Sequence, residues 1–253
     1  PAPRTVICIV ANAYSFRQCR AVSKVIQGDR MQDQWTQLKW RDGMVPISVQ
    51  FDDPYFSLDN GLAETKHVFL DGNFLPARFQ DGFHVAELGF GTGLNFLTTW
   101  QAWREADIFG KLFFSSFEAY PMSSTDMNIA LQSFPTLKNF TKKLMNAQIS
   151  GSVVFDFGDV ELKLIHGDAR ITLPIWTEKA DAWFLDGFSP VKNPELWGVD
   201  LMRQVAAHTK PKGTAATYTA AGFVRRGLED AGFIVERVPG YGRKRHMTRA
   251  FLG

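Results

Sequence analysis

Three glycines at alternate positions constrain the fold of this chain more than any other feature. They lie in Glu-Leu-Gly-Phe-Gly-Thr-Gly-Leu-Asn, residues 87–95, after an expected strand at 83–88 and before an expected helix at 94–106. Glycine allows a tight turn and a close approach of the backbone to a ligand, and the helix that follows directs its free N–H groups at that ligand. The segment therefore predicts a strand–turn–helix unit with a binding site at the turn.

The rest of the chain alternates between strand and helix patterns. Further strands are expected at 112–118, 152–165 (a strand or a hairpin), 181–186, 213–219, 233–238 and about 246–251. Further helices are expected at about 125–148, 169–175, 196–208 and 221–230. Such alternation predicts an α/β fold with a doubly wound, mostly parallel sheet. Its ligand site should lie beyond the carboxyl ends of the strands.

The N-terminal part differs from this α/β core, which is expected to cover residues 83–253. Residues 31–82 are predicted as a small β-rich segment that packs on the core, because WTQLKW (35–40) and ISVQF (47–51) alternate around the hairpin signal Asp42-Gly43. Residues 1–30 are basic and mixed in pattern, and we interpret them as a poorly ordered or peripheral extension, with Met31 an alternative start. Their apolar run, TVICIV, is too short for a signal peptide.

Composition excludes several classes of protein. The chain has 253 residues, 45% of them hydrophobic and 21% charged, as in an ordinary soluble globular protein. No apolar run approaches the roughly 20 residues that span a bilayer. Two cysteines near the N-terminus and five histidines without paired spacing make neither a disulfide framework nor a metal motif. We therefore expect a cytoplasmic protein with no metal and no membrane partner.

The charge is divided unevenly along the chain. Residues 203–253 hold 10 Lys and Arg against 3 Asp and Glu, whereas residues 1–202 hold 18 against 23. This division suggests a basic face near the C-terminus that meets phosphates, and a solvated surface is an equal alternative on charge alone.

Two classes of cofactor compete for the glycine turn. A dinucleotide motif needs a glycine at position 94, where this chain has Leu94, and Glu87 before Gly89 would repel a pyrophosphate. A carboxylate suits a cation, and the sulfonium of S-adenosylmethionine is one, while its carboxylate can use the helix N-terminus. The predicted cofactor is S-adenosylmethionine, held by Glu87, Gly89, Gly91 and Gly93.

Two more acids follow the next strands in order. Glu118 ends the strand at 112–118, where an acid would accept both ribose hydroxyls. Asp168-Ala169 follows the strand that ends near 165, where an aspartate would accept a hydrogen bond from the adenine amino group. For Asp168 a helix N-cap is a ready alternative.

Asp186 ends the fourth strand, where the reactive atom of a cofactor would lie. Gly-Phe-Ser-Pro follows it, in place of the Pro-Pro dipeptide found in many enzymes that methylate base amines. An aliphatic amine has a pKa of roughly 10 and must lose a proton before it can attack a methyl group. A carboxylate can orient that ammonium and accept or relay its proton. Asp186 is therefore the candidate catalytic residue, either as the base or as an orienting group.

Other residues are candidates for substrate binding. The wall of a base pocket is expected in the segment with Phe188, Pro190, Lys192 and Asn193, although Phe188 could equally be a core residue. Candidate contacts to phosphates are Arg225, Arg226, Arg243, Lys244 and Arg245, and Arg225 and Arg226 cannot both face one way on a helix. DDPYFS (52–57) is a candidate lid, with Tyr55 and Phe56 as its aromatic surface.

Six ordered blocks carry a resemblance to a known family. These blocks are FDDPYFSLDNGLAETKHVFL (51–70), ELGFGTGLNFL (87–97), FEAYP (117–121), DAWFLDGFSPVKNPELW (181–197), TYTAAGFVRRGLEDAGF (217–233) and GYGRKRHM (240–247). They closely resemble the methyltransferase half of the bacterial MnmC family over about residues 35–250. The resemblance implies a class I S-adenosylmethionine-dependent methyltransferase fold. It also implies N-methylation of the 5-aminomethyl group of 5-aminomethyl-2-thiouridine at the wobble position, in the anticodon loop of tRNA.

The resemblance also implies a partner. Several members continue into a flavin-dependent oxidase domain that makes the aminomethyl substrate, and this chain stops where that domain would begin. No flavin is therefore expected here, and an oxidase domain or protein is an expected partner. The alternatives are a small-molecule amine methyltransferase or aminopropyltransferase, an NAD-dependent oxidoreductase, and a non-catalytic RNA-binding module.

Overall fold

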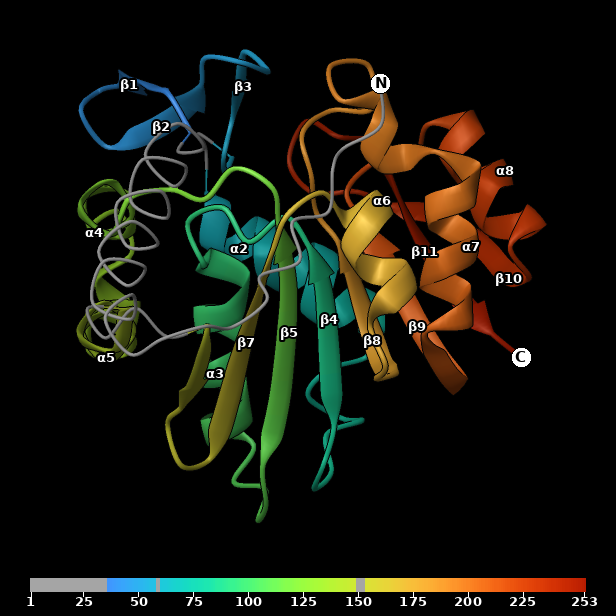
Figure 1. The fold of residues 1–253 in the computed structure, drawn as a ribbon, viewed down its shortest axis with the longest axis horizontal. Helices are drawn as coiled ribbons and strands as arrows, with labels where there is room; N and C mark the ends of the chain where they lie inside the picture. The colour runs from blue at the N-terminus through green and yellow to red at the C-terminus, as the bar shows by residue number, and fades with distance from the viewer. Residues whose placement is uncertain (1–35, 58–59, 149–152) are drawn as a thin grey trace, which may run out of the picture. The chain divides into compact units, whose positions relative to one another are not determined.

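An eight-stranded sheet forms the centre of the computed structural model, which describes residues 36–57, 60–148 and 153–253 (Figure 1). The strand order is β10-β11-β9-β8-β4-β5-β7-β6. In chain order these strands are β4 (His84–Leu88), β5 (Leu112–Glu118), β6 (Val154–Asp156), β7 (Val160–His166), β8 (Ala180–Leu185), β9 (Thr209–Thr217), β10 (Phe233–Pro239) and β11 (His246–Leu252). The expected extension at residues 1–30 lies outside the described residues.

The sheet is mostly parallel and doubly wound, as the sequence predicted. β4 pairs in parallel with both β5 and β8, and the parallel run continues to β7 on one side and β9 on the other. β6 and β11 are antiparallel to their neighbours. The order of the strands reverses between β4 and β8, and the crevice at such a reversal is where open α/β sheets bind ligands.

Helices cover both faces of the sheet. They are α3 (Leu94–Glu105), α4 (Ser124–Leu131), α5 (Lys138–Gln148), α6 (Ala169–Thr172), α7 (Val199–Ala207) and α8 (Gly222–Asp230), with short 3₁₀ turns at Pro135–Leu137, Leu173–Ile175 and Pro194–Trp197. α3, α4 and α5 contribute to one hydrophobic cluster, and α6, α7 and α8 contribute to a second.

Alternation along the strands separates these two clusters. In β8, Ala182 and Phe184 face the α3 side, whereas Trp183 and Leu185 face the α7 side. Successive strand residues point to opposite faces, so a strand covered on both faces is apolar throughout. Asp186 follows Phe184 by two positions, which places its side chain on the α3 side.

A separate three-stranded antiparallel sheet precedes the core, and it includes the predicted hairpin. β1 (Leu38–Arg41) pairs with β2 (Val45–Ser48), which pairs with β3 (Asp53–Pro54). Asp42 and Gly43 turn the hairpin with positive φ angles of 52° and 72°, the conformation that Asp and Gly tolerate best. The boundary proposed at residue 82 stays a prediction.

Two predicted elements begin three or more residues from the predicted position. The helix expected at 196–208 begins at Val199, because Pro194 favours a 3₁₀ turn and Gly198 adopts an extended conformation (φ −68°, ψ 149°) that separates the two. The strand expected at 213–219 runs from Thr209 to Thr217. Tyr218 therefore lies just beyond the strand, where its side chain can turn toward the carboxyl end of β8.

Helical turns between residues 61 and 73 were not predicted. They are α2 (Gly61–Thr65), a π-helical turn at Lys66–Leu70 and a 3₁₀ turn at Asp71–Asn73. The local signal was Asn60, whose side chain accepts a hydrogen bond from the Ala63 N–H at the start of α2. Three consecutive buried residues, Val68, Phe69 and Leu70, obscured the helical period, since a π turn spreads buried positions differently from an α-helix.

Within the described residues, no helix is long and apolar enough to cross a lipid bilayer. In the same part of the chain, no group of three or more His, Cys, Asp or Glu side chains is arranged to hold a metal ion.

Candidate functional site

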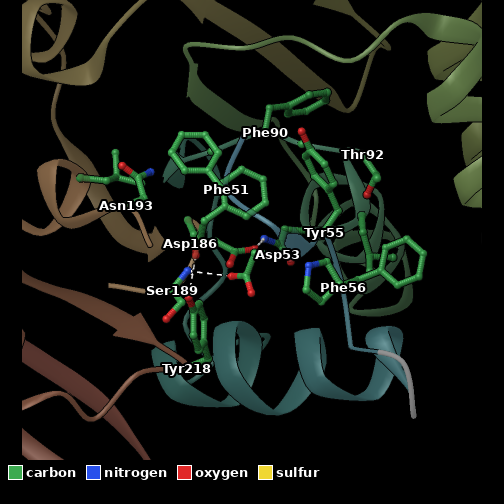
Figure 2. Close-up of a pocket in the computed structure, with 18 of the residues that line it drawn as sticks. Phe51, Asp53, Tyr55, Phe56, Phe90, Thr92, Asp186, Ser189, Asn193 and Tyr218 are labelled. Carbon is green, nitrogen blue, oxygen red and sulfur yellow. Dashed lines mark hydrogen bonds between the residues drawn. The ribbon is translucent and has the colours of Figure 1, made fainter. Parts of the chain in front are cut away.

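A cavity of about 920 Å³ opens at the carboxyl ends of β4, β5, β7 and β8 (Figure 2). Its walls come from the glycine turn after β4, the acids after β5 and β7, the loop after β8, residues 50–57, part of α2 and the loop at 241–244. This is the switch point of the sheet, the position expected from the topology. Ligand pockets for small molecules reach about 1,000 Å³, so the cavity has room for a nucleoside cofactor together with part of a substrate.

Packing within the chain explains the glycine turn. Gly89 and Gly91 have φ angles of 90° and 52°. A Cβ on Gly89 would lie 2.3 Å from the backbone oxygen of Asp186, and one on Gly91 would lie 3.0 Å from the ring of Tyr55. Both glycines line the cavity, whereas the predicted contact Gly93 does not and instead forms the N-cap of α3.

Glu118 lies at the rim of the cavity, where the sequence predicted it. One carboxylate oxygen accepts the Gly91 N–H at 2.9 Å and the other accepts the Tyr120 N–H at 2.7 Å. Each oxygen keeps a second lone pair, so the carboxylate can still accept two hydroxyl protons. The contact to Gly91 also connects the ends of β4 and β5.

Asp168 adopts the alternative role that its sequence context left open. Its side chain caps α6 by accepting the Arg170 N–H at 2.9 Å, and it forms an ion pair with the Arg170 guanidinium at 2.6 Å. Hydrogen bonds from that guanidinium lower the pKa of Asp168. Asp168, Ala169 and Arg170 all line the cavity. Cap and ligand contact are compatible, because a carboxylate offers about four acceptor sites.

Glu87 does not line the cavity, although it was predicted to contact the cofactor directly. It is fully buried on the α3 side, where Ser116 Oγ donates to it at 2.6 Å and Asn95 Nδ2 donates at 2.9 Å. Burial raises the pKa of Glu87 well above its usual value, and these hydrogen bonds oppose the rise. Glu87 is connected to the cavity wall by Asn95, which also donates a hydrogen bond to Asp186.

Asn95 was missed by sequence reasoning and is central to the site. Its Nδ2 also donates to Asp186 Oδ2 at 2.7 Å, and its Oδ1 accepts the Thr65 hydroxyl at 3.0 Å. Asn95 is buried in the first turn of α3. Its place beside the glycine turn was the available signal, but an asparagine in a first helical turn is usually read as local helix chemistry.

Asp186 lies in the wall of the cavity, one residue beyond β8. Removal from water raises the pKa of its carboxyl to about 7, and the hydrogen bond from Asn95 works in the opposite direction. The charge of Glu64 raises this pKa further, whereas that of Lys244 lowers it. A carboxyl with a pKa near neutrality can both hold and release a proton under ordinary conditions.

The loop after Asp186 is attached to the predicted lid. Phe188 stacks on Phe51 with ring centroids 4.7 Å apart and meets Tyr55 edge-on at 5.0 Å. The Ser189 N–H donates to Asp53 Oδ2 at 2.8 Å (Figure 2), and Lys192 lies 3.3 Å from the Asp53 carboxylate. Phe188, Lys192 and Asn193 line the cavity, and Pro190 is buried outside it.

The two lid aromatics are both at the cavity wall. The Tyr55 hydroxyl is hydrogen-bonded to Thr36 Oγ1 at 2.8 Å, and Phe56 packs edge-on against Phe134 at 5.0 Å. Burial raises the pKa of Tyr55, so its hydroxyl stays protonated. The aromatic surface predicted for residues 52–57 thus lies over the glycine turn.

The candidate RNA contacts divide into two groups. Arg243 and Lys244 line the cavity, whereas Arg225, Arg226 and Arg245 do not. Arg225 is half-buried and Arg226 is exposed, so the two face different ways as expected. Arg243 and Arg245 are exposed in the turn between β10 and β11. Lys244 instead forms an ion pair with Glu64 of α2, with Nζ and Oε1 2.8 Å apart.

These residues fit S-adenosylmethionine. The cavity joins a glycine turn, a carboxylate at the end of β5 and a capping aspartate after β7, in the order in which methionine, ribose and adenine parts would be met. Its lining is both polar and aromatic, which matches a charged nucleoside. Gly89, Gly91, Glu118, Asp168 and Ala169 are the predicted contacts that lie where they can hold it.

Comparison with known proteins agrees with this geometry. A family model described as S-adenosyl-L-methionine-dependent methyltransferase matches residues 133–252. A Vibrio cholerae protein, "tRNA 5-methylaminomethyl-2-thiouridine biosynthesis bifunctional protein MnmC", is 48% identical over 235 residues, which are 85% of this chain and 35% of that protein. The protein of the same name from Stutzerimonas stutzeri is 43% identical over 230 residues, 87% of this chain and 35% of its own. The chain thus spans about a third of the length of these relatives.

A solved structure shares the fold. The crystal structure of MNMC2 from Aquifex aeolicus superimposes with a TM-score of 0.68 at 21% sequence identity, and the match covers 93% of this chain and 83% of that one. The solved structure agrees with the fold, and the family model together with the relatives at 43–48% identity places the chain among the S-adenosyl-L-methionine-dependent methyltransferases, with similarity to about a third of the length of the MnmC proteins.

Proposed function

We propose that this chain transfers a methyl group to the 5-aminomethyl nitrogen of 5-aminomethyl-2-thiouridine at the wobble position of tRNA, giving 5-methylaminomethyl-2-thiouridine. The observation that carries the proposal is Asp186, a carboxyl with a pKa near 7 at the end of β8, hydrogen-bonded to Asn95 in the wall of the cavity. The names of the relatives, which refer to the biosynthesis of that nucleoside, supply the substrate.

S-adenosylmethionine, when bound, supplies the methyl group. The part of Asp186 is to prepare the nucleophile. An ammonium R–NH₃⁺ has no free lone pair, and transfer of one proton to the carboxylate gives R–NH₂ and a neutral carboxylic acid. The pKa of an aliphatic ammonium is roughly 10. Against an ordinary aspartate at 3.8 the proton transfer is uphill by about six pKa units, and at about 7 the gap narrows to about three.

Asn95 and the residues around it keep the carboxylate in position. Asn95 Nδ2 holds one oxygen of Asp186, which leaves the other oxygen for the amine. Phe51, Tyr55 and Phe188 form an aromatic wall beside it. Such a wall suits a flipped base, which stacks on aromatic rings when it leaves a single-stranded loop. An anticodon loop presents its wobble base at modest cost because the base is already unpaired.

The basic turn between β10 and β11 is proposed to contact the tRNA backbone. Arg243 lines the mouth of the cavity, and Arg245 is exposed in the same turn. A tRNA whose base enters the cavity would bring its phosphates to this turn. An oxidase domain or protein that supplies the aminomethyl substrate stays a prediction from the family resemblance.

The test is mass analysis of nucleosides after the chain is incubated with S-adenosylmethionine and tRNA that carries the aminomethyl group. The expected product is heavier than its substrate by one methylene. Asp186→Asn should reduce the single-turnover rate by at least about a hundredfold and leave cofactor affinity within about threefold. Asp200→Asn, an exposed aspartate on α7 outside the cavity, is the matched control. Methylation of polyamines without methylation of tRNA would contradict the proposal.

A further inference from the structure

Lys244 differs from its basic neighbours because it occupies a place built for a cation. Its Nζ lies 2.8 Å from Glu64 Oε1 and 4.0 Å from the centre of the Tyr218 ring. Glu64 and Tyr218 both line the cavity that contains Asp186. A carboxylate and an aromatic face together attract an ammonium more strongly than either does alone.

The carboxylate and the ring are fixed to the same framework as Asp186. Glu64 precedes Thr65, whose hydroxyl donates to Asn95, and Asn95 donates to Asp186. On the other side, the Tyr218 hydroxyl donates to the backbone oxygen of Gly187 at 2.7 Å, one residue beyond Asp186. The side chain of Glu64 is 13% exposed. The cation site is therefore linked by hydrogen bonds of neighbouring residues to the segment that carries the candidate catalytic acid.

Lys244, in contrast, is held weakly. Its side chain is 46% exposed, and it reaches the site from a turn that the Lys244 N–H closes by donating to the Tyr241 oxygen at 3.0 Å. A half-exposed ion pair contributes little to stability, and a cation–π contact made by an exposed lysine adds only modestly to it. A competing ammonium, or a phosphate beside the exposed Arg243 and Arg245, can therefore draw the lysine away.

We propose that Glu64 and the ring of Tyr218 form the subsite that recognises the ammonium of the substrate, and that Lys244 occupies this subsite until the substrate displaces it. The lysine side chain ends in the same primary ammonium that an aminomethyl group presents. Recognition at Glu64 would then select bases that carry a cationic arm, next to the acid that removes the proton. This inference rests on the proposed function for the identity of the amine.

The test compares two anticodon stem–loops that differ only in the amine. One carries 5-aminomethyl-2-thiouridine at the wobble position and the other carries 2-thiouridine. The ratio of their dissociation constants measures recognition of the amine, and contacts to phosphates cancel in it. For Glu64→Gln the ratio should fall by about fivefold or more, because a neutral amide replaces the carboxylate. For Lys244→Met it should rise by about twofold to fivefold, because the internal competitor is removed.

The control is Lys179→Met, an exposed lysine just before β8 and outside the cavity, which should leave the ratio unchanged. Thermal unfolding of each variant checks that the fold is retained, and Lys244→Gln repeats the test with a polar side chain. An unchanged ratio for both Glu64→Gln and Lys244→Met overturns the subsite, and so does a fall for Lys244→Met. A wild-type protein that leaves the aminomethyl stem–loop unmethylated refutes the proposed function instead, so the two failures can be distinguished.

Discussion

Asp186 and Glu87 are carboxyls on the same face of the sheet, joined by one amide, yet only Asp186 meets the cavity. Burial favours the neutral form of both. Only Asp186 can exchange its proton with a ligand in the cavity, and Asn95 can donate to both carboxyls in either state. The two carboxyls differ in role because Glu87 is fully buried whereas Asp186 lines the cavity.

The first residue-scale prediction concerns the pH dependence of methyl transfer. Asp186 must be ionised to accept a proton, so the single-turnover rate should rise with pH through about 7 and level above it. One unit below this pKa, about a tenth of the carboxyl is ionised, and the rate at pH 6 should be about tenfold below the plateau. Asp186→Asn should lose the inflection. A wild-type rate that is flat between pH 6 and 8 would count against a proton-accepting role.

A second residue-scale prediction concerns stability. The ordinary pKa of 3.8 for Asp186 rises to about 7 in the fold, so between these values the folded state keeps a proton that the unfolded state has lost. The free energy of unfolding therefore falls as pH rises through this window. Asp186→Asn should raise it by on the order of 1–3 kcal/mol at pH 8 and by less at pH 5. Denaturant unfolding at the two pH values measures the difference. An equal effect at both would show that ionising Asp186 in the folded state costs no free energy.

At the scale of elements, residues 51–57 and the loop after β8 behave as a pair. Asp53 accepts the Ser189 N–H and lies 3.3 Å from Lys192, and the Lys192 ammonium also donates to the backbone oxygen of Asp52. The neighbouring Asp52 has a carboxylate that is 86% exposed and lies 3.8 Å from Lys192. The two acids are adjacent in sequence, but only the Asp53 side chain accepts the Ser189 N–H, whereas the Asp52 carboxylate is exposed.

This difference gives a matched experiment. Asp53→Asn weakens the contact to Ser189, so the Ser189 amide should exchange with solvent at least about threefold faster, a change that a hydrogen-bond loss of about 1 kcal/mol would produce. The KM for tRNA should rise because the aromatic wall at Phe188 is less well positioned. Asp52→Asn should change neither quantity by more than about twofold, since an exposed pair contributes little. Equal effects of the two substitutions would show that the loops are not joined through Asp53.

The strands and the acids that follow them could be predicted from the sequence, whereas side-chain contacts between distant segments could not. The strands were found because buried parallel strands read as continuous apolar runs, and the acids that follow them were found because parallel strands end at one edge. Asn95, Thr65, Glu64 and Tyr218 were missed, since their roles depend on contacts between segments far apart in the chain. Nothing local marks Glu64 as the partner of Lys244, which lies in the turn after β10.

At the scale of the whole molecule, net positive charge is concentrated in the C-terminal part of the sequence. Residues 203–253 hold 10 basic and 3 acidic residues, and the turn with Arg243 and Arg245 brings two of the basic side chains to one end of the sheet, beside the cavity. The fold class could be predicted from alternation alone. The sequence analysis named Arg243, Lys244 and Arg245 together, but it could not tell that only the first two line the cavity, because the direction of each side chain depends on the geometry of one turn.

The prediction at this scale is a salt dependence. Each phosphate contact releases counterions, so Arg243→Ala with Arg245→Ala should reduce the slope of log affinity for tRNA against log salt by about two. Lys179→Ala, at the amino end of β8, is the control and should leave the slope within about half a unit. Titration at several salt concentrations measures the slope. A slope unchanged in the double variant would make the turn a solvated surface, the alternative left open by charge.

Any side chain at position 89 would bring its Cβ to 2.3 Å from the backbone oxygen of Asp186, and this contact limits how the enzyme can be engineered. The backbone of the glycine turn and the backbone that carries Asp186 touch without any side chain between them. If the end of β8 is moved outward to accept a bulkier amine, space for a side chain at position 89 is also created. If β8 stays in place, only glycine fits at position 89. The glycine turn and the end of β8 must therefore be redesigned together, as one structural unit.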